Sequence, residues 1–198
     1  MDLRVIDENN DNNNKYNNIL SFLKHKTLNN DVKWKDRPIR SLHVSIIINK
    51  KKTINHTLCE NDGNRTCIGG KFVPCSIHAE YKTIYSLVNN MPELKSLSDF
   101  INPFHCHKIR LTPKQKRILN KMDIIVVRFN AHDELSDSRP CCFCAKLIHM
   151  LNFNRCIYSI NHNTLESVKS QDLIIGEKTS GYKRFIKKEK LKYRNVYK

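Results

Sequence analysis

Two short motifs in the sequence carry residue types that bind metals and transfer protons. The first runs from His78 to Glu80 (H-A-E) and the second from Pro140 to Cys144 (P-C-C-F-C). One imidazole and two thiolates form a three-ligand set for Zn²⁺ that leaves the fourth tetrahedral position open to water, which is typical of catalytic zinc rather than structural zinc. The pattern therefore predicts one catalytic zinc ion per chain, held by His78, Cys141 and Cys144.

The second motif fits the first turn of a helix. Residues three apart lie on nearly the same helix face, so Cys141 and Cys144 can point at one metal, and Pro140 is tolerated in a first turn because its missing N–H would be unpaired there. The positive end of the helix and the metal both lower the pKa of the thiols. Glu80 is the candidate general acid/base, because a carboxylate beside a metal can accept a proton from water and pass it on.

Predicted helices and strands must position these motifs. Helical spacing of apolar residues begins at each motif, and alternating or unbroken apolar runs indicate strands between them. The predicted helices cover 79–89 and 140–151, and the predicted strands cover 42–49, 53–59, 122–129, 156–160 and 173–175. The first two strands form a hairpin, and the strand over 122–129 is expected to be covered on both faces. This order predicts an α/β fold, a three-layer α/β/α sandwich with a mixed central sheet.

The length of 198 residues fits one domain with tails. Residues 1–39 are expected to form a mostly disordered, Asn-rich arm and linker, because residues 7–18 have almost no large apolar side chains. Within this segment the apolar patch at 19–23 could dock onto the domain as a short helix. The domain is expected over 40–181, with an insertion at 91–121 that prolines interrupt. Residues 182–198 form a basic C-terminal tail.

Basic residues dominate the chain, whose formal net charge is +16. Such a charge favours nucleotides or nucleic acid as partners, although a genome that favours Lys and Asn codons explains it equally well. In the insertion at 91–121, a capping box formed by Thr112 and Gln115 is expected to open a short helix. In the tail at 182–198, aromatic residues are interleaved with basic ones, as in segments that bind nucleic acid, or else the tail packs onto the domain as an amphipathic helix.

No stretch approaches the ~18 to 20 apolar residues of a membrane span, and the first residues lack the apolar core of a signal peptide. The eight cysteines are therefore interpreted as thiols, metal ligands and core residues rather than as a disulfide framework. These features predict a protein without a membrane partner that is not secreted and resides in a reducing compartment, the cytoplasm or the nucleus.

Together the two motifs resemble the zinc-dependent cytidine and deoxycytidylate deaminase superfamily, whose signature is H-x-E followed by P-C-x-x-C. The resemblance runs from about Ser41 to Ile175. It implies a cytidine deaminase-like fold and an enzyme, a hydrolase that converts the cytosine base of a nucleoside or nucleotide to uracil and releases ammonia. Glu80 would be its proton shuttle. Many relatives assemble as dimers or tetramers, so a homo-oligomer is expected.

The resemblance also suggests residues that bind substrate. Asn64 resembles the asparagine that contacts sugar in many members of the superfamily. Arg139, before the proline of the second motif, could bind a 5′-phosphate or a backbone phosphate, or it could be solvated. The gap between the motifs exceeds that of compact nucleoside deaminases by about the length of the insertion at 91–121, which could form part of the pocket mouth or a partner surface.

Alternatives remain for both the site and the function. Cys141 and Cys144 could form a redox pair. A second, structural zinc could be imagined at Cys59, Cys67, Cys75 and the His105-Cys106-His107 run, although their spacing lacks close ligand pairs. The function could be that of a deaminase acting on RNA or DNA, bound through the tail and the insertion. It could also be that of a catalytically silent protein of the same fold that binds nucleic acid or has a structural role.

Overall fold

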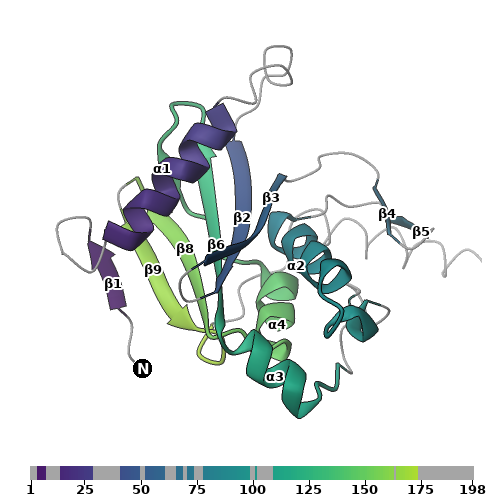
Figure 1. The fold of residues 1–198 in the computed structure, drawn as a ribbon. Coiled ribbons are helices and arrows are strands. Elements are labelled where there is room, and N and C mark those ends of the chain that lie inside the picture. The colour runs from purple at the N-terminus through teal and green to yellow at the C-terminus, as the bar shows by residue number, and fades with distance from the viewer. Residues whose placement is uncertain are drawn as a thin grey trace, which may run out of the picture.

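A seven-stranded mixed sheet forms the centre of the structure, and helices pack against it (Figure 1). The structure is a computed structural model that describes residues 4–7, 14–28, 41–49, 52–60, 66–68, 71–73, 78–98, 101, 109–162 and 164–173. The strand order is β1-β9-β8-β6-β2-β3, and β7 pairs with β6 beside this path. The strands of the sheet are β1 (Arg4–Asp7), β2 (Ser41–Asn49), β3 (Lys52–Glu60), β6 (Met122–Asn130), β7 (Leu135–Ser136), β8 (Arg155–Asn161) and β9 (Thr164–Lys169). Two short strands, β4 (Thr66–Ile68) and β5 (Lys71–Val73), pair separately.

One parallel pair makes this sheet mixed. Strands β6 and β8 run parallel, whereas the other neighbouring strands run antiparallel. Parallel neighbours need a crossover connection, and helix α4 (Cys142–Met150) lies in the connection between β6 and β8. The predicted hairpin is confirmed, because β2 and β3 pair antiparallel. The mixed α/β class predicted from the sequence is therefore confirmed.

Strand β6 is buried on both faces, as its unbroken apolar run predicts. Ile124 and Val126 belong to a core that includes residues of α2 (Ala79–Asn90) and α4. Ile125 and Val127 belong to a second core, which includes Leu23 of α1 (Asn14–Leu28). Successive side chains of a strand point to opposite faces, so one strand supplies apolar groups to both cores.

The insertion predicted at 91–121 contains the 3₁₀ helix η2 (Lys95–Leu97) and helix α3 (Pro113–Leu119). The predicted capping box is confirmed. The Gln115 N–H donates to Thr112 Oγ1 at 3.2 Å, and the Thr112 N–H donates to Gln115 Oε1 at 3.0 Å. These reciprocal bonds satisfy backbone donors that a helix start leaves unpaired.

Two elements lie within residues 1–39, for which the sequence predicts a mostly disordered arm and linker. Strand β1 pairs with β9 at the edge of the sheet, and α1 carries the fully buried Leu23. Residues 164–169 form β9, a strand that the sequence analysis does not predict, and this strand pairs antiparallel with β8. The predicted strand at 173–175 lies, beyond its first residue, outside the described residues. The predicted tail at 182–198 lies outside the described residues.

Among the described residues, the helices are too short or too polar to cross a bilayer.

Candidate metal centre

His78 and Cys141 each stand directly before a helix. His78 is the N-cap of α2 and Cys141 is the N-cap of α4, and both have extended backbones. Helix α4 therefore begins slightly later than the sequence predicts, because the extended ψ of 167° at Cys141 leaves Pro140 outside the first turn. Cys144 is the third helical residue of α4. The centre thus lies between two helix N-termini, whose unpaired N–H groups favour negatively charged ligands.

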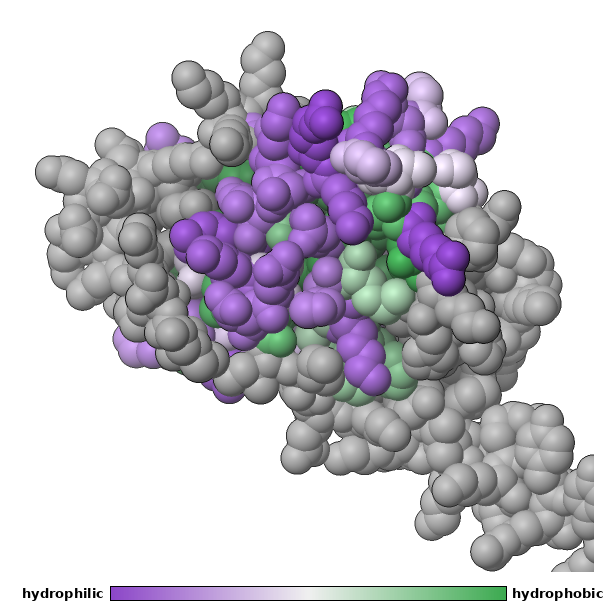
Figure 2. Space-filling model, turned by 90° about the horizontal axis from the view of Figure 1, so that it is seen from below, coloured by the Kyte–Doolittle hydropathy of each residue, from purple (hydrophilic) through white to green (hydrophobic). Residues whose placement is uncertain are grey.

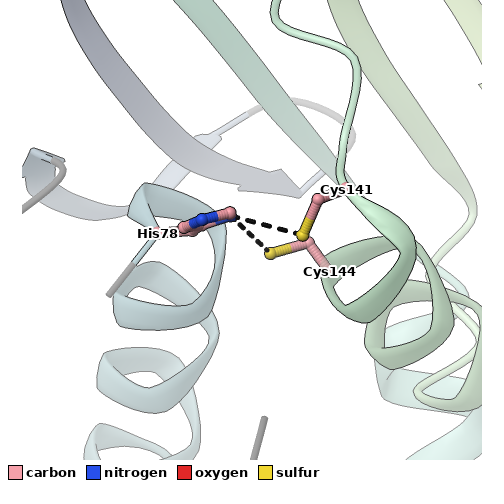
Figure 3. A group of neighbouring side chains, drawn as sticks. All are labelled: His78, Cys141 and Cys144. Carbon is pink, nitrogen blue, oxygen red and sulfur yellow. Dashed lines mark hydrogen bonds between the residues drawn. The ribbon is translucent and has the colours of Figure 1, made fainter. Parts of the chain in front are cut away.

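The structure brings the three predicted ligands together (Figure 3). His78 Nδ1 lies 3.4 Å from Cys141 Sγ and 3.5 Å from Cys144 Sγ. All three ligand atoms lie within 4.8 Å of one another. Cys144 is buried, whereas His78 and Cys141 are partly exposed. The cluster is therefore close enough to bind one metal ion and retains an exposed side.

The three side chains strongly influence one another's protonation. Hydrogen bonding with the Cys144 thiol, together with His78, lowers the pKa of Cys141 to about 4 although burial opposes this. The same bond and burial raise the pKa of Cys144. Burial alone would lower the pKa of His78, but Cys141 and Glu80 outweigh it and raise this pKa to about 9. A bound cation would displace these protons, because metal ligands must be deprotonated.

Glu80 lies beside this cluster and is almost completely buried. It is the second helical residue of α2 and is 3% exposed. Its Oε2 atom has no hydrogen-bond partner among the described residues. Burial raises the pKa of Glu80, although the charge of His78 opposes the shift. A buried carboxyl group that lies beside a histidine and has an oxygen without a hydrogen-bond partner among the described residues can accept and release a proton.

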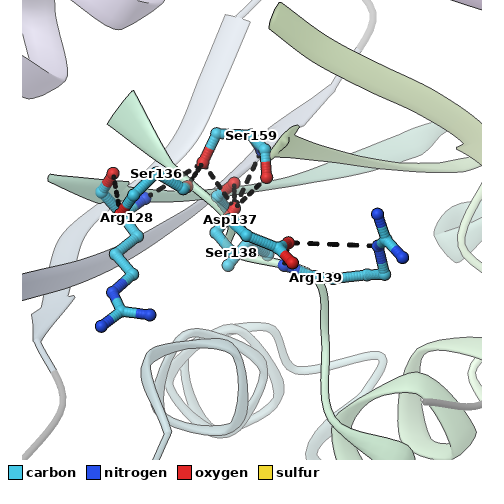
Figure 4. Close-up of polar contacts among 7 residues, drawn as sticks. Arg128, Ser136, Asp137, Ser138, Arg139 and Ser159 are labelled. Atoms are coloured by element: carbon cyan, nitrogen blue, oxygen red, sulfur yellow. Dashed lines mark hydrogen bonds and ion pairs between the residues drawn. The ribbon is translucent and has the colours of Figure 1, made fainter. Parts of the chain in front are cut away.

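A serine cluster holds the segment that leads into Cys141 (Figure 4). The Ser138 hydroxyl donates to the Val126 carbonyl of β6 at 2.7 Å, and the Ser159 N–H of β8 donates to Ser138 Oγ at 2.8 Å. The Ser138 N–H donates to the Ser159 carbonyl at 2.9 Å. Two central strands therefore determine where the chain enters α4. Sequence reasoning misses these residues, and Ser136 and Ser138 so close before the motif are the signal that could have identified them.

The predicted substrate residues are not part of the three-ligand cluster. Arg139 lies at the surface, where its Nε is 4.0 Å from Asp137 Oδ1 and its guanidinium carbon is 5.9 Å from the centre of the Tyr158 ring. Asn64 lies outside the described residues. A role for either residue in substrate binding stays a prediction.

Sequence reasoning also misses a pair of basic residues near the cluster. His43 of β2 and Arg128 of β6 are register partners, and both are partly buried. Burial, followed by the charges of Arg128 and His78, lowers the pKa of His43 to about 4, which leaves it neutral at neutral pH. No motif marks these residues, because only the register of two antiparallel strands makes them neighbours.

The remaining cysteines divide into two groups. Cys142 and Cys156 are buried and, like Cys141 and Cys144, form no disulfide. Cys156 is a core residue of β8, as predicted. The residues suggested for a second zinc have side chains outside the described part of the chain: Cys59, Cys67, Cys75, His105, Cys106 and His107.

A scan against protein-family models finds no match for the chain, and searches of curated proteins and of solved structures find none either. The chemistry assigned to the centre consequently rests on its own residues and their geometry.

Proposed function

We propose that this protein is a zinc-dependent hydrolytic deaminase that converts the cytosine base of a nucleoside or nucleotide to uracil and releases ammonia. The observation that carries the proposal is the convergence of His78, Cys141 and Cys144 beside the buried Glu80. The sequence around these residues resembles the H-x-E and P-C-x-x-C signature of the superfamily. Apolar cores on both faces of the mixed sheet support a three-layer, cytidine deaminase-like sandwich.

The geometry of the cluster fits zinc. Tetrahedral coordination with Zn–S bonds of about 2.3 Å and Zn–N bonds of about 2.0 Å places a nitrogen and a sulfur ligand about 3.5 Å apart. The distances from His78 Nδ1 to the two sulfurs, 3.4 and 3.5 Å, match this separation. Two thiolates would also offset the charge of a divalent cation. His78, Cys141 and Cys144 would therefore hold the ion without a large rearrangement.

A zinc ion in this position would act as a Lewis acid toward water and the substrate. Glu80 takes one proton from the attacking water and passes it to N3 of the base. It then takes the second proton from the new hydroxyl on C4 and donates it to the departing amine. The water oxygen bonds to C4, the bond between C4 and the amino nitrogen breaks, and the products are uracil and ammonia. The raised pKa of Glu80 suits this role, because the carboxyl can then hold a proton closer to neutral pH.

The test combines zinc analysis with ammonia release from cytidine, dCMP and a cytosine-containing oligonucleotide. We expect one zinc per chain and turnover of at least one substrate. Glu80→Gln should keep its zinc and fold but lose about 100-fold or more in kcat, the usual contribution of a general acid/base. The matched control is Glu134→Gln, because Glu134 is an exposed carboxylate in the loop before β7. Zinc-loaded protein that turns over none of the three substrates would refute the proposal, and a fully active Glu80→Gln would refute the role of Glu80.

A second candidate is a protein of this fold that binds nucleic acid without turnover and keeps the metal for stability. The exposed lysines and arginines around α3 favour it. This candidate predicts zinc binding and strongly salt-dependent binding of nucleic acid, but no ammonia from any substrate. A deaminase that acts on a polynucleotide would show both activities.

A further inference from the structure

Exposed charges are distributed unevenly over the described surface. The segments 91–98 and 109–121 carry six exposed basic residues and one exposed acidic residue, Glu93. We call these six the α3 basic face: Lys95, Arg110, Lys114, Lys116, Arg117 and Lys121. The other exposed charges that the structure describes are four basic residues, Lys24, Arg139, Lys146 and Lys169, and four acidic residues, Asp133, Glu134, Asp137 and Asp172. If the lysine-rich composition alone were responsible, exposed basic residues would outnumber acidic ones on the rest of the described surface as well. They do not, so the α3 basic face is a local feature.

A buried side chain holds this face together. Gln115 is 4% exposed, and besides its capping bonds its Nε2 donates to the Glu93 carbonyl at 3.1 Å and to Ser96 Oγ at 3.0 Å. These bonds join α3 to the segment around η2, so Lys95 is held close to α3. On the exposed side of α3, Lys114 and Arg117 are three residues apart and share one face. The positive charges are thus carried by two segments that hydrogen bonds of one buried side chain join.

The face lies away from the metal centre. Helix α4 begins beside Cys141 and rises about 13 Å over its nine residues. Figure 1 shows α3 next to the opposite, C-terminal end of α4. Figure 2 views the molecule from below, the side on which α3 lies, and shows hydrophilic side chains gathered across it. A ligand can therefore bind this face without entering the metal centre.

We propose that the α3 basic face binds the phosphodiester backbone of a nucleic acid strand. Closely spaced cations release counterions from a polyanion, which drives binding that does not depend on base sequence. An anionic membrane is a poorer fit, because membrane-bound helices insert apolar side chains, whereas Ile118 and Leu119 of α3 pack against the protein core. This surface goes beyond the proposed deaminase activity and does not depend on it.

The test measures binding of the zinc-loaded protein to a fluorescent oligothymidylate of roughly 15 nucleotides by anisotropy over a range of salt concentrations. The probe contains no cytosine, so its binding is independent of deamination. The face variant is Lys114→Gln, Lys116→Gln, Arg117→Gln. The matched control removes the same charge elsewhere, as Lys24→Gln, Lys146→Gln, Lys169→Gln. All six residues are exposed, so thermal unfolding should show little change in either variant.

We expect the face variant to bind the oligothymidylate about 100-fold more weakly near 0.1 M salt. A plot of the logarithm of its association constant against the logarithm of salt concentration should have a slope shallower by about 2, since each of the three lost phosphate contacts contributes about 0.7. The control should change little. Equal losses in both variants, or unchanged binding by the face variant, would overturn the proposal. So would a face variant that loses binding to phosphatidylglycerol vesicles while keeping its affinity for the oligothymidylate. Loss of deamination alone would refute only the proposed function.

Discussion

Replacing the buried Glu80 by an apolar residue of similar length should stabilise the protein and abolish its activity. Glu80 is 3% exposed, and its Oε2 has no hydrogen-bond partner among the described residues. Methionine is flexible, has a similar volume and requires no partner. Glu80→Met therefore removes a buried polar group that, under the proposed function, serves the reaction rather than the stability of the fold.

The gain is at most the cost of a buried, unsatisfied polar group, about 1–3 kcal/mol, because Oε2 lacks a partner among the described residues whereas the carboxyl also bonds with the Cys144 thiol. For a chain of this length, each kcal/mol shifts Tm by about 2–4 °C, so we expect a rise of about 2–12 °C. Ammonia release should meanwhile fall to background, because methionine cannot carry a proton.

The stabilisation should depend on pH. Burial raises the pKa of Glu80 above its ordinary value of 4.5, so the folded protein keeps a proton that the unfolded chain has already lost. The stability that this proton contributes is fully present below the pKa of Glu80 in the unfolded chain. It is lost as the pH rises through the pKa of Glu80 in the folded protein. The advantage of Glu80→Met should therefore be smallest in acid and grow toward neutral pH.

Thermal unfolding followed by circular dichroism, with and without a chelator, measures the effect. The control is Thr83→Val on the same helix, because the buried Thr83 hydroxyl donates to the Ser45 carbonyl at 3.1 Å. That change removes a satisfied polar group and should destabilise the protein by about 1–3 kcal/mol. If, with chelator present and at neutral pH, Glu80→Met unfolds at a lower temperature than the parent protein, the prediction that Glu80 destabilises the fold is wrong.

Two further predictions concern the ligands and their surroundings. Cys141→Ala should lose its zinc and unfold at a lower temperature than the parent, because metal binding contributes to folding. The control Cys142→Ala should keep its zinc. Equal zinc content of the two variants in elemental analysis would contradict the assignment of Cys141 as a ligand. The pKa of His43 falls from 6.5 to about 4 in the folded protein, so only the unfolded chain binds this proton between these values. Stability should then decrease from about pH 6.5 toward pH 4 by up to about 3 kcal/mol, and denaturant titrations of His43→Gln should show a flatter profile.

Local patterns in the sequence account for much of the fold. The capping box of Thr112 and Gln115 and the helix that follows His78 are predictable because their interactions join residues only a few positions apart. The unbroken apolar run of β6 likewise predicts burial on both faces, because a strand directs alternate side chains to opposite sides.

The candidate site is predictable in its residue types but not in its geometry. The sequence by itself determined that a histidine precedes one helix, that two cysteines three residues apart lie at the start of another, and that a carboxylate follows the histidine. His78 and Cys141 are 63 positions apart, and only the sheet, the crossover through α4 and the serine bonds to β6 and β8 bring their side chains together. The pairing of His43 with Arg128, and the attachment of Gln115 to the segment around η2, were likewise decided by tertiary structure. The physical reason is that such contacts depend on strand register and on the packing of helices against the sheet. Both join residues that are far apart in the sequence, and separation along the chain does not tell how far apart two side chains lie in space.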